Sequence, residues 1–215
     1  MTLITKWLLG RLGRLHPVSL AGPASALLEL PAPNRVGGMP LMEALAKRHS
    51  EREFAPTPLS QQQLSDLLWA ADGINRPELQ EHTAPSAMNA QEVDIYVALA
   101  AGLYRYDAVG HVLELVASSD ARSVTGIQDF VDTAALDLVY VADHARMKLI
   151  PQRSRETYAA ICVGAITQNV SLYCASAGLA SVVRGLFDAT LLGDALGLSE
   201  QQTIVLTQTV GCTRA

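Results

Sequence analysis

The run of residues 155–177 is the sequence feature that most limits how this chain can fold. It has the length of a long helix, and apolar side chains such as Ile161, Ile166 and Val170 spread around it rather than along one stripe. A helix that is apolar on most sides is buried, either inside its own domain or against another subunit. We expect this helix to form a homodimer interface that contains Val170, because its apolar surface is too large for a solvent-facing element.

Shorter helical and extended patterns surround this helix. Ser60 and Gln63 have the spacing of a capping box, so a helix should begin there and end at Gly73. Val182 to Leu186 is expected to form an extended turn after the long helix. The other predicted elements are a helix over 40–47, strands over 93–99, 136–141 (apolar on both faces and therefore central) and 203–210, and a hairpin of 102–106 with 111–116 around the turn 107–110.

Composition and charge exclude several classes of protein. A chain of 215 residues can form one large domain with a proper core. Its formal charge of −5 argues against a nucleic-acid partner, which would require a basic face. The three cysteines lie in apolar surroundings, and neither a CxxC nor an HExxH motif occurs. A disulfide framework and a metal site are therefore not expected.

The N-terminal segment, residues 1–39, is predicted to lie outside the folded domain, which should span residues 40–215. Its basic residues precede an apolar run and a small-residue site in the order of a secretory signal, but His16, Pro17 and Gly22 interrupt the run. We therefore favour an N-terminal arm over a cleaved signal and expect a cytoplasmic protein, with export left open. No stretch of about 20 uninterrupted apolar residues occurs, so a membrane span is not expected.

The segment 48–54 carries the most distinctive chemistry, because two arginines, a histidine and a hydroxyl fall within five residues. Arg48 and Arg52 would share one face of a continuing helix, or would converge from a helix end and the following loop. In either case their planar guanidiniums can bind a phosphate through paired hydrogen bonds. The alternative is a solvated basic helix end, in which Glu51 and Glu53 pair with the arginines.

A second candidate stretch, residues 83–91, combines small and amide side chains directly before a predicted strand. Such a loop can bring main-chain N–H groups close to a flat polar ring. An ordinary polar loop is the simpler interpretation of these residues alone.

Together these stretches resemble the flavin-dependent nitroreductase family, in the same order along residues 40–211. The residues of the segments 68–77 and 102–107 are most similar to those of the branch of azoline-oxidising dehydrogenases that act in peptide-modifying pathways. The motifs that carry the resemblance are Arg48-His49-Ser50 with Arg52 and Phe54, Pro85-Ser86 with Asn89 and Gln91, and Gly178-Leu179 leading into Gly185-Leu186-Phe187-Asp188.

The resemblance implies an α+β fold, a three-layer sandwich whose mixed, mainly antiparallel sheet lies between helices. It also implies a homodimer with two FMN sites at the interface, each lined by both subunits, with NADH or NADPH as electron donor and a small organic acceptor such as a nitroaromatic or a quinone. The cofactor supplies the chemistry, so no catalytic side chain is assigned. The implied FMN-binding residues are Arg48, His49, Ser50 and Arg52 around the phosphate, Pro85, Ser86, Ala87 and Asn89 against the ring, Gln128 at its pyrimidine end, Val183, Arg184 and Gly185 near N5, and Arg214 as the C-terminal basic residue.

FMN is preferred to FAD because no GxGxxG turn follows a predicted strand. Three alternatives stay open at this point. They are an azoline-type peptide dehydrogenase, a protein of the same fold that carries or fragments flavin without redox chemistry, and an interaction protein that dimerises through its long helix.

Overall fold

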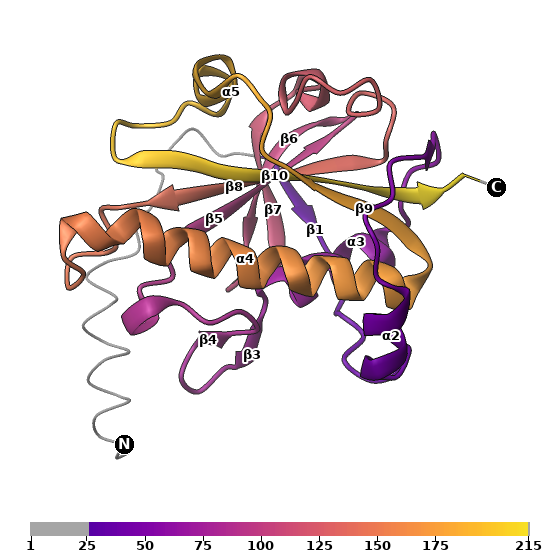
Figure 1. Cartoon of the computed structure of the whole chain (residues 1–215), viewed down its shortest axis with the longest axis horizontal. Helices are drawn as coiled ribbons and strands as arrows, with labels where there is room; N and C mark the ends of the chain where they lie inside the picture. Colours follow the sequence, from indigo (N-terminus) through magenta and orange to yellow (C-terminus); the bar gives the residue numbers. More distant parts are fainter. Residues whose placement is uncertain (1–25, 215) are drawn as a thin grey trace.

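The computed structural model describes residues 26–214 as one eight-stranded sheet with helices on both faces (Figure 1). The elements in chain order are β1 (Leu27–Glu29), α2 (Leu41–Lys47), β2 (Phe54–Ala55), α3 (Gln61–Asp72), β3 (Ile74–Arg76), β4 (Glu81–His82), η1 (Ala87–Asn89), β5 (Val93–Leu99), β6 (Gly102–Asp107), β7 (Val112–Ala117), η2 (Arg122–Val124), β8 (Leu136–Asp143), α4 (Gln152–Ala177), β9 (Leu179–Arg184), α5 (Ala189–Leu196) and β10 (Gln202–Thr213).

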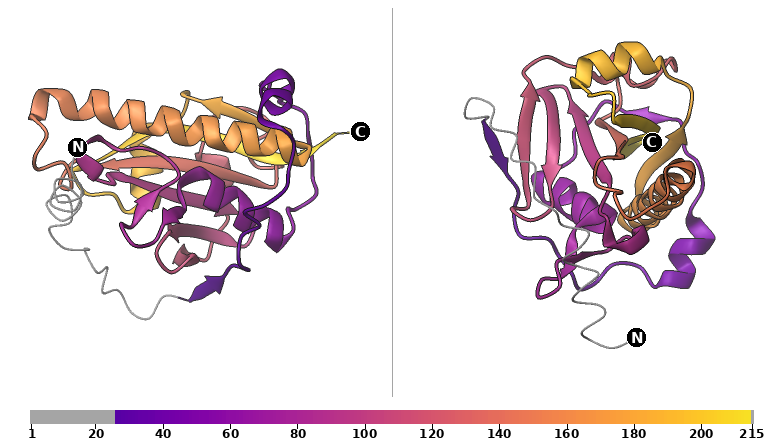
Figure 2. Two further views of the ribbon diagram at one scale, coloured as in Figure 1. Left: turned by 90° about the horizontal axis from the view of Figure 1, so that it is seen from below. Right: turned by 90° about the vertical axis from the view of Figure 1, so that its left-hand side faces the viewer.

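The large sheet has the strand order β1-β7-β6-β5-β8-β10-β2, and β9 pairs with β10. All the strand pairings among the described residues are antiparallel. α3 and α4 cover one face and α5 covers the other, as Figures 1 and 2 show. The predicted α+β three-layer fold is therefore confirmed. β8 lies between β5 and β10, as its apolar character on both faces predicted.

Two apolar clusters hold these layers together. Between the sheet and the helices α3 and α4, the side chains of Leu67, Leu138 and Ile166 are fully buried. On the opposite face, Leu192 and Leu196 of α5 pack against the sheet. Each face of the central strands is therefore covered by a helix, which is why their sequences are apolar without alternation.

Helix α4 begins at Gln152, three residues before its predicted start, and Pro151 occupies its N-cap position without a side-chain cap. Val170 is fully buried in the core of its own chain, so its predicted place in a subunit interface is wrong. The exposed side of α4 instead carries Tyr158, 43% exposed, and Ile161, 61% exposed. By length and hydropathy α4 could cross a membrane, but nearly half of its most apolar window is buried against the sheet and α3.

Two strand predictions differ from the structure. Residues 179–184 form the strand β9, paired with residues 207–212, where the sequence predicted an extended turn. β10 also continues through Gly211 to Thr213, because its end pairs with β2. A Cβ at Gly211 would lie 3.0 Å from the Phe54 ring, so glycine lets these two strands approach closely.

The chain already contributes to the sheet upstream of Pro40, where the sequence predicted the start of the folded domain. β1 pairs with β7, and the amide of Met39 donates a 2.7 Å hydrogen bond to the Ser176 hydroxyl at the end of α4. The predicted choice between an arm and a signal falls mostly on residues 1–25, which lie outside the described residues.

A buried polar network fixes how α4 sits on the sheet. The Tyr140 hydroxyl donates to Gln208 Oε1 at 2.6 Å, and Gln208 Nε2 donates to the Ser171 hydroxyl at 3.2 Å. Ser171 in turn donates to the Thr167 carbonyl at 2.8 Å. Because these partners lie on β8, β10 and α4, the network stabilises one alignment of the helix over the two strands.

Replacing Tyr140 by phenylalanine should lower the free energy of unfolding by roughly 1–3 kcal/mol, because Gln208 Oε1 stays buried without a donor. Urea unfolding of the two proteins measures this loss. Tyr104→Phe is the matched control, since the Tyr104 hydroxyl has no hydrogen bond among the described residues. Equal losses in both variants would contradict a role for the network.

Candidate functional site

The segment that follows α2, which we call the arginine loop (residues 48–54), leaves its two guanidiniums without carboxylate partners. α2 ends at Lys47, and the Arg48 amide donates to the Ala44 carbonyl at 2.8 Å as the helix closes. Arg48 therefore lies at a helix end and Arg52 in the loop that follows, so the two do not share one face of a continuing helix. Within the described chain, Arg48 makes no side-chain hydrogen bond or ion pair, and Arg52 Nη1 reaches only the Ser50 carbonyl at 3.4 Å.

Glu51 organises the arginine loop from within. Its carboxylate accepts hydrogen bonds from the amides of Arg52, at 2.7 Å, and Glu53, at 2.9 Å. These bonds lower the pKa of the Glu51 carboxyl. His49 bridges the Lys47 carbonyl and the Glu51 carboxylate, contacts that raise the pKa of its imidazole. The alternative in which Glu51 neutralises the arginines is therefore not what the structure shows.

The C-terminal end of β10 lies beside the arginine loop. Thr213 pairs with Phe54, and the Arg214 amide donates to the Glu53 carbonyl at 3.4 Å. Arg214 thus brings a third cationic residue to the segment that already carries Arg48 and Arg52. A hollow of about 40 Å³ opens here, between the arginine loop, Thr213 and the C-terminal half of α4.

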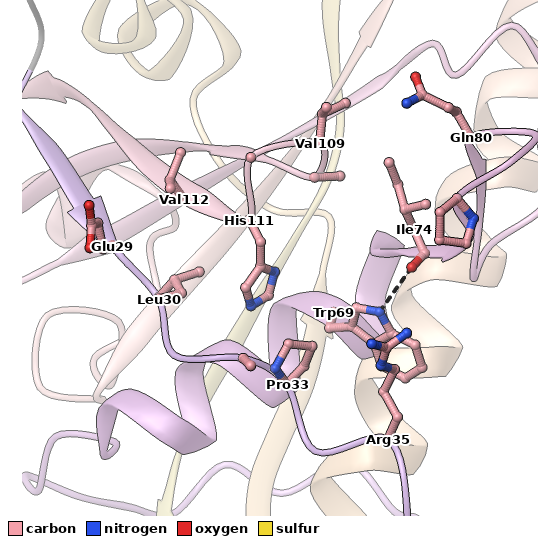
Figure 3. A pocket seen from close by; sticks show the side chains of 14 residues that line it. Glu29, Leu30, Pro33, Arg35, Trp69, Ile74, Gln80, Val109, His111 and Val112 are labelled. Carbon is pink, nitrogen blue, oxygen red and sulfur yellow. Dashed lines mark hydrogen bonds between the residues drawn. The ribbon is translucent and has the colours of Figure 1, made fainter.

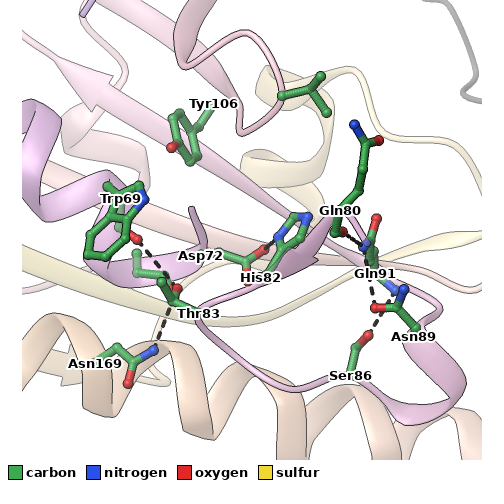
Figure 4. Close-up of polar contacts among 12 residues, drawn as sticks. Trp69, Asp72, Gln80, His82, Thr83, Ser86, Asn89, Gln91, Tyr106 and Asn169 are labelled. Carbon is green, nitrogen blue, oxygen red and sulfur yellow. Dashed lines mark hydrogen bonds and ion pairs between the residues drawn. The ribbon is translucent and has the colours of Figure 1, made fainter. Parts of the chain in front are cut away.

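The second candidate stretch, which we call the amide loop (residues 83–91), adopts an unusual backbone. Met88, Asn89 and Gln91 all have positive φ, at 55°, 54° and 48°, although none is glycine. Such conformations are costly and concentrate at functional sites. Side chains hold the loop in this shape, because Ser86 Oγ accepts from the Gln91 amide at 3.0 Å and Gln91 Nε2 donates to Asn89 Oδ1 at 3.3 Å (Figure 4).

These contacts change the predicted role of the loop. The amides of Asn89, Ala90 and Gln91 are used within the loop, so they are not available to a ligand, contrary to the expectation of several free main-chain donors. Met88 is 44% exposed at the tip, and Ala87 packs on the cluster that contains Met147 and Ala159. The loop therefore presents small and apolar surface more than backbone donors.

Asp72 and His82, which the sequence analysis did not single out, form a contact directly before the amide loop (Figure 4). His82 Nδ1 lies 2.9 Å from Asp72 Oδ2, and both side chains are nearly buried. Burial raises the pKa of Asp72, against the opposing effect of His82. This contact joins β4 to the end of α3 and so fixes the strand that leads into the loop.

The end of β9, whose backbone is predicted to approach the N5 atom of the flavin, carries one exposed and one buried side chain. Val183 is 38% exposed, but the side chain of Arg184 turns inward and is buried. Its Nη2 lies 2.6 Å from Asp137 Oδ1, and its Nη1 donates to the Thr125 carbonyl at 3.0 Å and to Gln128 Oε1 at 3.2 Å. A direct contact between this guanidinium and a cofactor is therefore excluded in this conformation.

Asp137 and Gly126 complete the surroundings of Arg184. Burial raises the pKa of Asp137 to about 6, while Arg184 and the Thr209 hydroxyl favour its ionised form. A Cβ at Gly126 would collide with Arg184 Nη1, so glycine is needed for the loop to pass over the guanidinium. The sequence did carry one signal of this pair, since Asp137 is an acidic residue inside an otherwise apolar central strand.

The arginine loop and the amide loop lie at opposite ends of α4, whereas Gln128 contacts Arg184 at the end of β9. The arginine loop and Arg214 lie by the C-terminal half, where Ser171 and Ala175 line the same hollow. The amide loop packs near Ala159 in the N-terminal half. Because a helix rises 1.5 Å per residue, about 20 Å of α4 separates the two groups. Figure 1 shows them at the two ends of the horizontal helix.

Comparison with known proteins gives a consistent result. The model of the nitroreductase family matches residues 45–212. A protein of Methanocaldococcus jannaschii named as a nitroreductase, MJ1384, is 29% identical over 184 residues, covering 77% of this chain and 88% of that protein. The crystal structure of a nitroreductase-like protein of Ralstonia eutropha is 49% identical, with a TM-score of 0.85 over 94% of this chain and 96% of that one.

A chain of the Escherichia coli microcin synthetase McbBCD complex also shares the fold. Its TM-score is 0.71 at 17% identity, over 96% of this chain and 87% of that one. At this identity the likeness concerns the fold alone.

Proposed function

The chain belongs to the nitroreductase family, and from this premise we propose that it is an FMN-dependent oxidoreductase. In this proposal it passes hydride between NADH or NADPH and an organic acceptor such as a nitroaromatic or a quinone. The observation that carries the proposal is the arginine loop, whose guanidiniums have no carboxylate partner among the described residues.

The arginine loop suits the phosphate of FMN. A phosphate group needs several charge-assisted donors, and a guanidinium offers two parallel ones. Arg48 and Arg52 would supply them together with the Ser50 hydroxyl, and Arg214 would approach from β10. His49 would lie alongside, since its ring is already engaged with Lys47 and Glu51. Glu51 holds the loop in the required shape through backbone amides and forms no ion pair with Arg48 or Arg52.

The separation of the two groups along α4 supports a site shared between two chains. If two copies pack their α4 helices antiparallel about a twofold axis, the amide loop of the partner lies next to the arginine loop of this chain. The surfaces needed for this are exposed in the single chain. They are Leu41, Met42 and Leu45 of α2 and Tyr158 and Ile161 of α4.

In this arrangement Pro85, Ser86, Ala87 and Asn89 of the partner's amide loop would lie against the isoalloxazine ring. The backbone of residues 183–185 would approach its N5 edge, where Gly185 carries no side chain to obstruct the ring. Gln128 must present its oxygen to Arg184, because a guanidinium only donates hydrogen bonds. Its NH₂ group therefore remains to donate to a carbonyl at the pyrimidine end of the ring.

The chemistry would come from the cofactor, because bound FMN accepts and gives hydride through its N5 atom. The residues of the chain place the ring and set its surroundings. No cluster of His, Cys, Asp and Glu among the described residues could hold a metal ion.

We expect the purified protein to be yellow and to release FMN, not FAD, on heating. NADPH or NADH should bleach the flavin absorbance, and a nitroaromatic or a quinone should restore it. Chromatography of the released cofactor against standards and a stopped-flow absorbance record measure the two steps. A colourless protein that takes up no FMN would exclude the proposal, and a yellow protein that no nicotinamide bleaches would favour a flavin carrier.

A further inference from the structure

A cavity of about 590 Å³ lies away from the proposed flavin site (Figure 3). Its volume falls in the range of small-molecule sites. Four separated chain segments build it, and none of the predicted FMN-binding residues lines it. The lining consists of Glu29, Leu30, Ala32, Pro33 and Arg35 before α2, Trp69 of α3, Ile74, Pro77 and Gln80 around β3, and residues 108–112 of the β6–β7 turn.

A chain of hydrogen bonds makes one wall of the cavity rigid. The Ser65 hydroxyl donates to the Pro31 carbonyl at 2.5 Å and must then accept from His111 Nε2 at 2.7 Å. His111 Nδ1 consequently accepts from the Tyr106 hydroxyl at 2.9 Å. This arrangement requires a neutral imidazole, and burial lowers the pKa of His111 accordingly. The wall is therefore preformed, and both ring nitrogens are already used.

Backbone strain also concentrates at this cavity. Gln80 and His111 both have positive φ, at 49° and 51°, and both line it. The other non-glycine residues with positive φ in the described chain belong to the amide loop. Because such conformations persist mainly where the surroundings enforce them, they point to a second constrained site.

The lining indicates what the cavity would bind. Trp69 is fixed as a flat wall because its indole N–H donates to the Ile74 carbonyl at 3.2 Å. Arg35 is exposed, and its guanidinium makes no hydrogen bond or ion pair in the part of the chain that the structure describes. Glu29 lies on the far side of the cavity in Figure 3, where it would repel a second negative group.

We propose that this cavity is a binding site for small monocarboxylates with an apolar body. The carboxylate pairs with the Arg35 guanidinium, which matches its geometry, and the apolar body lies against Trp69 and Pro33. None of the predicted FMN-binding residues lines this site, although Gln91 of the amide loop donates a 2.6 Å hydrogen bond to the carbonyl of Gln80 in its lining.

Trp69 is one of two tryptophans, so a Trp7→Phe background isolates its fluorescence. The full chain in this background, with FMN at saturation, is titrated with 4-tert-butylbenzoate and with the neutral 4-tert-butylbenzamide. We expect a saturable change of Trp69 emission with the acid. Affinity should fall about tenfold or more for the amide and for Arg35→Gln, because a charge-assisted pair is lost.

Two matched variants locate the site. Arg153→Gln removes an exposed arginine elsewhere, and Arg48→Ala alters the proposed phosphate site, so neither should change the affinity for the acid. The absence of a saturable change, equal affinities for acid and amide, or an unchanged affinity in Arg35→Gln would overturn the proposal. A loss in Arg48→Ala instead would place the carboxylate at the arginine loop.

Discussion

Arg48→Ala is expected to weaken FMN binding by about tenfold to a thousandfold while changing the stability of the apo-protein little. Charge-assisted hydrogen bonds contribute roughly 1.5–3 kcal/mol each, and the alanine variant loses a bidentate pair. The fold should not suffer, because the Arg48 guanidinium has no partner among the described residues. Titration of apo-protein with FMN, together with urea unfolding of the apo forms, separates the two effects.

Arg48→Lys should recover only part of the affinity, since an ammonium keeps the charge without the planar fork. Arg35→Ala serves as the control, because Arg35 is an exposed arginine that lines the separate cavity and has no side-chain partner among the described residues. If Arg48→Ala bound FMN as tightly as the parent, Arg48 would not belong to the phosphate site, and the main support for the proposed function would be lost.

Local patterns in the sequence were sufficient for α2, α3, most of α4 and the β6–β7 hairpin, whereas α5 was not predicted. The capping box at Ser60 and Gln63 is present with both of its hydrogen bonds, and α3 follows it directly. In the hairpin, Asp107 accepts from the amides of Val109 and Gly110, which is a short-range interaction between neighbouring residues. Signals of this kind involve residues a few positions apart, so they can be recognised before any tertiary contact is known.

Elements that depend on distant partners were missed. β9 becomes a strand only because residues 207–212 pair with it, and β10 is extended past Gly211 by its pairing with β2. β1 has three residues, and its identity as a strand rests on β7. Propensity is weak evidence for such short edge elements, because the partner and the burial decide their conformation.

The segments of the candidate site were identified one by one from the sequence. Their positions along α4 in the single chain were not predicted. The arginine loop and the amide loop were both identified from their residue types. That they lie about 20 Å apart along α4 follows only from the packing of the helix. Arg184 was assigned to the cofactor through its backbone, and the sequence did not show that its side chain pairs with Asp137 in the core. Sequence alone cannot tell a buried ion pair from a ligand-binding arginine.

Ile161→Glu should abolish both the dimer and FMN binding while leaving a folded monomer. Ile161 is 61% exposed on α4, on the face that the proposed partner would cover, so the single chain tolerates a charge there. Within a dry interface the same carboxylate would stay unpaired, which is strongly unfavourable. FMN binding should be lost with the dimer, because the amide loop against the ring would come from the other chain.

Light scattering measures the oligomeric state, the flavin spectrum measures FMN binding, and circular dichroism verifies the fold. Val116→Glu is the matched control, since Val116 is an exposed aliphatic residue, 41% exposed, on β7, which lies beside the edge strand β1. The control should remain dimeric and yellow. A folded monomeric Ile161→Glu protein that still binds FMN with the affinity of the parent would show that one chain holds the cofactor alone. In that case the arginine loop would act without the partner's amide loop, and the pairing of α4 helices would have no part in the site.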